Sequence, residues 1–255
     1  MIDFCVAING INLKYQVPLF FETLFKNVNV DQFHIHVVEK GIEPAIHRYI
    51  QKMKEQSPVP FTIHILNEPL AEEVGPSREQ IVWTGGDAGL TCNWMMENCG
   101  TNDWMIISHF DIGFNSDFTI PLFAKMNHRT GMVGVHAKGL VAINRIAYNQ
   151  CFVGFQSMTG FFIVKEDKWR LRHGQDVRCK DTQHRKEHIE GFDVAELLEL
   201  CIQAKGWETV LFREFDCFHI GAGSGYHDSV KIAQSQKQRT RQQLDRHKIK
   251  AIGES

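Results

Sequence analysis

Long apolar runs are absent from this 255-residue sequence. No run approaches the roughly 18–20 apolar residues that a helix needs to cross a bilayer, so we expect no membrane-spanning segment. The first residues also lack the basic segment, the apolar segment and the small-residue cleavage site of a signal peptide. The seven cysteines are odd in number and form no Cys-x-x-Cys pair, which indicates reduced thiols rather than a disulfide framework. These absences together predict a cytoplasmic protein.

A strong charge of either sign is absent too. The sequence has 28 Lys and Arg against 30 Asp and Glu, a net charge of −2. A chain this close to neutral gives no reason to expect nucleic acid as a partner. Positive charge gathers in residues 229–255, a basic C-terminal helix or tail that could make a peripheral contact with an anionic membrane. The tail lacks the apolar face of an interfacial helix, so a solvated or packing helix is the alternative.

The first half of the sequence alternates short apolar runs with helical patterns. The runs predict four strands, at residues 4–8, 33–38, 61–66 and 104–108. Near-continuous apolar strands separated by helices are typical of a parallel sheet with helices on its faces. We therefore predict an α/β fold of the Rossmann-like type, with a central, mostly parallel mixed sheet, in one domain of residues 1–228.

The second half is less regular. It predicts further strands at residues 131–135, 160–164 and 209–212, and a clear helix at residues 192–205. Residues 170–189 are polar and have no apolar period, which predicts a loop. A loop in this place could close as a flap over a bound ligand.

Polar side chains follow the four predicted strands of the first half. Ligands of such sheets bind beyond the carboxyl ends of the strands. The residues at these ends are Asn9, Glu39, Asn67 and Asp111. They mark the predicted binding edge of the sheet.

Asp111 belongs to the run His109-Phe110-Asp111, which directly follows the strand of residues 104–108. Side chains two positions apart on an extended segment point the same way, so the imidazole and the carboxylate can address one ligand. A carboxylate oxygen is a hard ligand that suits Mg²⁺ or Mn²⁺. A turn or helix-cap role is the alternative for Asp111.

Two later motifs carry further chemistry. His219 stands just ahead of a glycine-dense loop that ends near Ser224, where backbone N–H groups could approach phosphate oxygens. Asp193 lies at the start of the predicted helix of residues 192–205, where the helix dipole stabilises an anion. Asp193 is therefore a candidate base or an N-cap, and Glu190 and Glu196 are its close rivals as base.

The order of these motifs resembles the GT-A glycosyltransferases, most closely the inverting glycosyltransferase family 2. The resemblance implies a metal-dependent transfer of sugar from a nucleoside-diphosphate sugar to a hydroxyl of a glycan or a lipid-linked acceptor. It implies Mn²⁺ or Mg²⁺ at Asp111 and His219, with Asp193 or Glu190 as the base. The residues expected to contact the donor are Ile8, Asn9, Glu39, Asn67, Asn93, His109 and Ser224.

The sequence departs from the family pattern at His109, which replaces the first aspartate of the metal motif. Histidine can still ligate Mn²⁺ or donate a hydrogen bond to a ribose, but it removes a negative charge. Two other functions therefore remain open. One is a nucleotide-sugar or sugar-binding module without turnover. The other is a metallohydrolase whose site would combine five residues: His34, His36, His109, Asp111 and His219.

Overall fold

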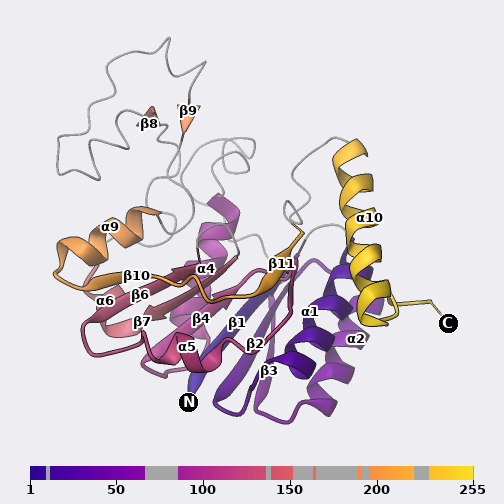
Figure 1. Cartoon of the computed structure of the whole chain (residues 1–255), viewed down its shortest axis with the longest axis horizontal. Coiled ribbons are helices and arrows are strands. Elements are labelled where there is room, and N and C mark those ends of the chain that lie inside the picture. Colours follow the sequence, from indigo (N-terminus) through magenta and orange to yellow (C-terminus); the bar gives the residue numbers. More distant parts are fainter. Residues whose placement is uncertain are drawn as a thin grey trace.

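The computed structural model describes residues 1–9, 12–66, 86–135, 139–151, 163–164, 189–190, 196–220 and 230–254. Its main feature is a seven-stranded sheet with the order β10-β6-β7-β4-β1-β2-β3 (Figure 1). The strands are β1 (Ile2–Ile8), β2 (Phe33–Lys40), β3 (Phe61–Leu66), β4 (Trp104–Ser108), β6 (Thr130–Val135), β7 (Leu140–Asn144) and β10 (Glu208–Leu211). Within this sheet β7 runs antiparallel to both neighbours, whereas all the other pairs are parallel. The predicted α/β fold with a mostly parallel mixed sheet is confirmed.

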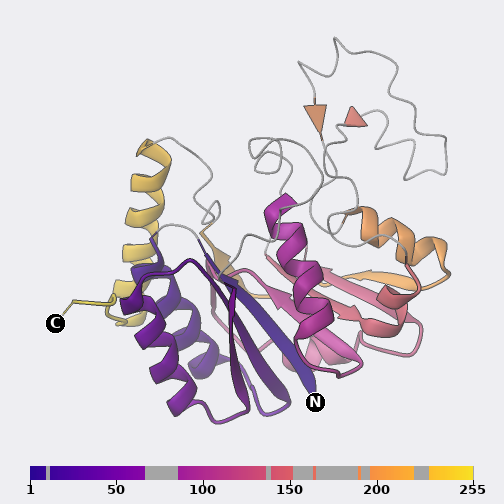
Figure 2. The same ribbon diagram turned by 180° about the vertical axis from the view of Figure 1, so that it is seen from behind.

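Helices cover both faces of this sheet. They are α1 (Leu13–Asn27), α2 (Pro44–Gln56), α4 (Gly86–Asn98), α5 (Thr119–Phe123), α6 (Arg145–Asn149), α9 (Glu196–Ala204) and α10 (Val230–His247). The view from behind shows α4 in front of the sheet (Figure 2). Helix α2 shows why these segments are helical: it begins with Pro44, and its buried residues Ile46, Ile50 and Met53 form one stripe at helical spacing. None of the helices in the described ranges combines the length and the apolarity needed to cross a membrane.

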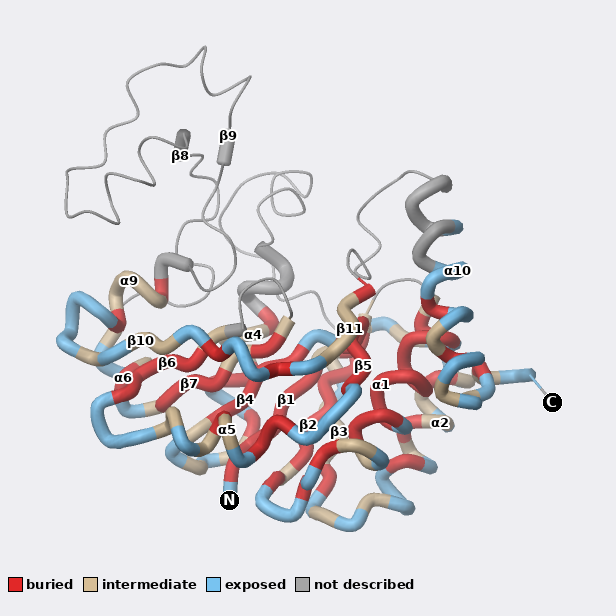
Figure 3. Tube along the Cα trace, viewed as in Figure 1, coloured by how far each residue is buried: buried red, intermediate tan, exposed pale blue. Residues whose placement is uncertain are grey.

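Strand β1 shows how the core divides into two layers. Phe4, Val6 and Ile8 belong to a buried cluster that includes residues of α1 and α2. Cys5, between them in sequence, belongs to a second cluster that includes Met95 and Met96 of α4. This alternation follows from the period of two along a strand. Buried residues are therefore concentrated in the central strands and in the inner faces of the helices (Figure 3).

Two short antiparallel pairs lie outside the main sheet. The first pairs β5 (Ile112–Phe114) with β11 (Cys217–His219), and the second pairs β8 (Ile163–Val164) with β9 (Ile189–Glu190). Helix α1 anchors β5, because Thr23 Oγ1 accepts a hydrogen bond from the N–H of Phe114 at 3.1 Å. Asn27 Nδ2 donates to the carbonyl of the same residue at 2.7 Å. These bonds fix β5 against α1.

The basic C-terminal segment forms helix α10, which packs against α1. Leu244 and Ala251 are buried in a small cluster with Tyr15 and Leu19 of α1. Lys237 and Arg241 lie over the ring of Tyr15, with 5.6 and 5.4 Å to its centroid. The described part of this segment is therefore a helix that packs on α1.

Candidate metal and nucleotide site

Three candidate ligands meet just beyond the end of β4. The Nδ1 atom of His109 lies 3.6 Å from Oδ1 of Asp111, and Nε2 of His219 lies 3.2 Å from the same oxygen. The ring centroids of the two histidines are 5.6 Å apart. One ligand atom of each residue lies within 4.8 Å of the other two. The structure thus brings together the three residues that the sequence places in the metal motif and ahead of the glycine loop.

The pairing of β5 with β11 puts His219 in this place. In their antiparallel register His219 lies opposite Ile112, the residue that follows Asp111. The N–H of Ile220 also donates to the carbonyl of Asp111 at 2.9 Å. One step along the pair, the ring of Phe218 fills the space in which a side chain of Gly113 would stand, 1.9 Å from an ideal Cβ. Glycine at position 113 therefore lets β11 approach β5 closely.

A second glycine supports His109. The N–H of His109 donates to the carbonyl of Gly139 at 2.7 Å. Gly139 has a φ of +69°, and a Cβ there would lie 2.8 Å from Cγ of His109. Glycine is suited to both demands, because it adopts a positive φ readily and leaves room for the ring. The turn before β7 therefore positions the first residue of the metal motif.

The three side chains differ sharply in exposure. The side chain of Asp111 is 5% exposed, that of His219 is 24% exposed and that of His109 is 61% exposed. Burial by itself would raise the pKa of Asp111, but the hydrogen bonds and the charge of His109 and His219 outweigh it. The pKa of this carboxyl consequently lies well below its usual range. The site offers an ionised, buried carboxylate with two imidazoles, and it opens toward solvent on the His109 side.

This donor set fits a divalent cation. Imidazole nitrogen and carboxylate oxygen together suit Mn²⁺ better than Mg²⁺, which prefers oxygen ligands throughout. Asp111 and His219 would hold the ion, with His109 at the exposed side.

Other predicted donor contacts lie at the same edge of the sheet. Ile8 and Glu39 face one another in the register of β1 and β2, and Asn9 follows directly after β1. Glu39 is 2% exposed, and its Oε2 accepts a hydrogen bond from Nδ1 of His47 at 2.6 Å. Its Oε1 is buried and has no hydrogen-bond partner among the described residues. This carboxylate oxygen at the end of β2 can thus accept a hydrogen bond from a bound ligand.

Asn93 lies on α4, where its Oδ1 accepts a hydrogen bond from the hydroxyl of Tyr148 at 3.2 Å. Three other predicted residues lie outside the described part of the chain: Asn67, Asp193 and Ser224. Glu190 is described only as a backbone position in β9. The roles given to these residues stay predictions.

A second polar cluster lies on the α4 face of the sheet, from Asp3 at the start of β1 through His36 in the middle of β2 to His64 of β3, which lies opposite Val38. Asp3 is fully buried, and its Oδ1 lies 3.3 Å from Nε2 of His36. Nδ1 of His36 in turn lies 3.1 Å from Nε2 of His64, and the ring of His34 lies beside that of His36, with 4.0 Å between centroids and the two planes tilted by 35°. The sequence indicates that His34 and His36 form a pair. The other members of the cluster could not be predicted, because they become neighbours only when β1, β2 and β3 pair in parallel.

This cluster is separate from the metal motif. Asp3 lies opposite Met105 in the pairing of β1 with β4, and Met105 precedes His109 by four positions. At about 3.3 Å per residue, Asp3 and its neighbour His34 lie about 13 Å from His109 along the strands and His36 about 7 Å from it, and β1 separates β2 from β4. The five residues of the hypothetical metallohydrolase site thus divide into two groups, His34 with His36 and the His109 group, and do not form one site.

Besides His36, Asp3 is held by Asn102 and Arg145. Asn102 donates to it from its backbone N–H at 3.0 Å and from Nδ2 at 2.7 Å, and Arg145 lies 3.3 Å from its Oδ2. Burial raises the pKa of Asp3, but hydrogen bonds from His36 and Asn102 outweigh it, so the pKa is lowered. Burial and the neighbouring His36 lower the pKa of His64.

No protein-family model and no curated protein sequence matches the chain. Among solved structures it is similar to the mannosyltransferase PcManGT from Pyrobaculum calidifontis in complex with GDP-Man and Mn²⁺, at 12% identity and a TM-score of 0.51. That match covers 96% of this chain but 63% of PcManGT, so the chain spans less than two thirds of that protein. A weaker similarity is to the glycosyltransferase GlyE of Streptococcus pneumoniae TIGR4, at 10% identity and a TM-score of 0.48, covering 99% of this chain and 65% of GlyE. Another is to the galactosyltransferase LgtC with donor and acceptor sugar analogs, at 10% identity and a TM-score of 0.46, covering 92% of this chain and 83% of LgtC.

The likeness to PcManGT and the mixed, mostly parallel sheet assign the chain to the GT-A fold. At this level of identity the likeness concerns the fold alone, so the activity has to be argued from the site.

Proposed function

We propose that the chain is a metal-dependent glycosyltransferase that takes its sugar from a nucleoside-diphosphate sugar. The observation that carries the proposal is the meeting of Asp111, His219 and His109 just beyond β4 in a GT-A fold. A diphosphate needs a divalent cation beside it, and this carboxylate and its imidazoles supply a suitable set of ligands. The Mn²⁺ and GDP-Man that accompany PcManGT are consistent with such a site.

Each residue of the site has a separate role in binding the donor. Asp111 and His219 hold the cation, and the exposed His109 faces the donor. Bound Mn²⁺ would neutralise the charge that develops on the diphosphate leaving group. Glu39, whose Oε1 has no hydrogen-bond partner in the described part of the chain, would accept a hydrogen bond from the ribose or the base of the nucleotide.

The finer assignment is an inverting transfer of the family 2 kind, to a hydroxyl of a glycan or a lipid-linked acceptor. In this assignment Asp193, or Glu190 as its rival, takes the proton of the acceptor hydroxyl while the hydroxyl oxygen attacks the anomeric carbon. Asn67, Asn93 and Ser224 would complete the donor contacts. The stereochemistry of the product tests this assignment independently of the metal site.

The test is calorimetry with UDP, GDP and dTDP, with and without Mn²⁺, followed by nucleotide release from a panel of donor sugars. We expect one nucleotide to bind much more tightly with Mn²⁺, and its donor sugar to be hydrolysed slowly. Asp111→Asn should lose the metal-dependent part of binding. Asp103→Asn is the matched control, because Asp103 is an exposed aspartate ahead of the same strand β4.

Three results would contradict the proposal. Donor binding that is equal with and without Mn²⁺ would exclude the metal site, as would full binding by Asp111→Asn. Metal-dependent binding without any nucleotide release from any donor would instead favour the binding module without turnover.

A further inference from the structure

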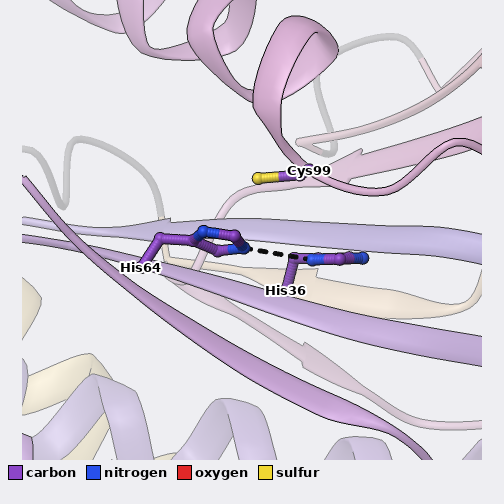
Figure 4. A group of neighbouring side chains, drawn as sticks. All are labelled: His36, His64 and Cys99. Atoms are coloured by element: carbon purple, nitrogen blue, oxygen red, sulfur yellow. Dashed lines mark hydrogen bonds between the residues drawn. The ribbon is translucent and has the colours of Figure 1, made fainter.

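The second polar cluster contains a set of side chains that the proposed glycosyl transfer does not use. His36 of β2, His64 of β3 and Cys99, which directly follows α4, place one ligand atom each within 4.8 Å of the other two. Figure 4 shows the two rings side by side on neighbouring strands, with the sulfur of Cys99 directed over them from the end of the helix. We propose that these three residues form a zinc site, which fastens the C-terminal end of α4 to the sheet.

The separation of the two imidazoles suits one tetrahedral ion. Nδ1 of His36 and Nε2 of His64 face one another at 3.1 Å. Two nitrogens bound to the same Zn²⁺ at about 2.0–2.1 Å in tetrahedral geometry lie about 3.3 Å apart. A small shift therefore converts the present His–His hydrogen bond into two bonds to zinc.

The surroundings of His36 match those of a zinc ligand. Its other ring nitrogen, Nε2, lies 3.3 Å from Oδ1 of the buried Asp3. A metal-bound histidine usually donates its second ring N–H to a carboxylate in this way, which fixes the tautomer and aims the free nitrogen at the metal. Asp3 is itself held by Asn102 and Arg145, so the orientation of His36 is determined before any metal binds.

Cys99 gives the site its preference for zinc. Thiolate sulfur with imidazole nitrogen selects Zn²⁺ over Mg²⁺ or Mn²⁺, which favour oxygen. Binding would release the thiol proton of Cys99 to solvent and leave the Nε2 proton of His36 in place. The proton of the His36–His64 hydrogen bond, which is then on Nε2 of His64, would be given up to solvent while Nδ1 of His64 takes one, so that Nε2 of His64 is free to bind the ion. Arg145 donates hydrogen bonds to the carbonyls of Cys99 and Met96, so the end of α4 is already held over the strands.

Access to the site runs past His64. His36 and Cys99 are buried, whereas His64 is only half-buried, at the outermost strand of the sheet and edge-on to Trp94 with 5.5 Å between centroids. An ion could enter from this side, and a water molecule could take the fourth position there. With three protein ligands and one water, the coordination number of zinc is satisfied.

The test uses Co²⁺ as a spectroscopic substitute for Zn²⁺ on the full, reduced chain. We expect Co²⁺ to produce a sulfur-to-cobalt charge-transfer band in the near ultraviolet, and Zn²⁺ to abolish it by displacement. Cys99→Ser should lose the band. Cys92→Ser, on the same helix, and Asp111→Asn, in the other site, should keep it. The Asp111 control separates this proposal from the proposed function, since the three ligands described there, His109, Asp111 and His219, include no thiolate.

Two outcomes would overturn the proposal: no charge-transfer band in the wild-type chain, or a band of full intensity in Cys99→Ser. If Cys99→Ser does not fold, the half-buried His64 offers a milder variant. His64→Gln, with folding checked by circular dichroism, should bind Co²⁺ at least about tenfold more weakly. Wild-type affinity for Co²⁺ in folded His64→Gln would also overturn it.

Discussion

Nε2 of His219 lies 3.2 Å from Oδ1 of Asp111, although the two residues come from opposite halves of the chain. The contact is produced by β11, which pairs antiparallel with β5 and brings His219 opposite the residue after Asp111. Strand β5 is in turn bonded to Thr23 and Asn27 of α1. The geometry of the proposed metal site therefore depends on a short strand pair and on the helix that anchors it, as well as on the ligands themselves.

Removing each histidine of this site should weaken the metal-dependent binding of nucleotide to a different degree. His219 is closer to Asp111 and less exposed than His109, so it contributes the better-positioned ligand. We expect His219→Ala to reduce Mn²⁺-dependent nucleotide affinity by more than about tenfold, and His109→Ala to reduce it less. Calorimetry measures both, and the exposed His128 supplies the control His128→Ala. Equal affinity in His219→Ala and wild type would remove His219 from the site.

A methyl group at Gly113 should disturb the site without touching a ligand. An alanine Cβ there would overlap the ring of Phe218, the neighbour of His219 on β11. We expect Gly113→Ala to lower the free energy of unfolding by about 1–3 kcal/mol and to weaken Mn²⁺-dependent nucleotide binding. Gly134→Ala is the matched control, because Gly134 is also in a strand and a Cβ there meets nothing within 4 Å. Identical effects in the two variants would mean that the β5–β11 contact does not shape the site.

Much of the fold could be predicted from sequence because its elements are local. The strands at Phe4, Phe33, Phe61 and Trp104 are short apolar runs, and their alternation with helical patterns specifies a parallel sheet. Strand β7 was not predicted. It is defined by antiparallel pairing with β4 and β6, and pairing partners are distant in sequence.

In the candidate site too, the residues with a local sequence signal were predicted, and those that depend on distant pairing were not. Asp111 was predicted from its place after an apolar strand, and His219 from the glycine-rich sequence that follows it. The support of His109 by Gly139 was not predicted, since it depends on a turn that the antiparallel β7 brings beside β4. The group of Asp3, His36 and Cys99 was not predicted either, because three separate elements have to meet before these residues become neighbours.

Asp3 should contribute strongly to stability, because it is a fully buried carboxylate with charged and polar partners. Asp3→Asn leaves Arg145 beside a neutral group and removes the charge that faces His36. We expect the free energy of unfolding, measured by urea denaturation at neutral pH, to fall by about 3 kcal/mol. Asp103→Asn, at an exposed aspartate, should change it by less than about 0.5 kcal/mol. A loss of the same small size in both variants would show that the buried partners of Asp3 contribute little.

Comparing Gly139→Ala with Gly206→Ala separates the effect of backbone strain from the effect of displacing His109. An alanine at position 139 would have to adopt a φ of +69°, and its Cβ would lie 2.8 Å from Cγ of His109. Gly206, just beyond α9, has a φ of +86° but an open surrounding, with nothing within 4 Å of its Cβ position. Gly206→Ala should therefore cost about 1–2 kcal/mol of stability from strain alone and leave Mn²⁺-dependent nucleotide binding unchanged. Gly139→Ala should cost at least as much and also weaken that binding, because the new methyl group displaces the His109 ring. If both variants lose stability equally and both bind nucleotide as the wild type does, then the position of His109 does not govern the metal site.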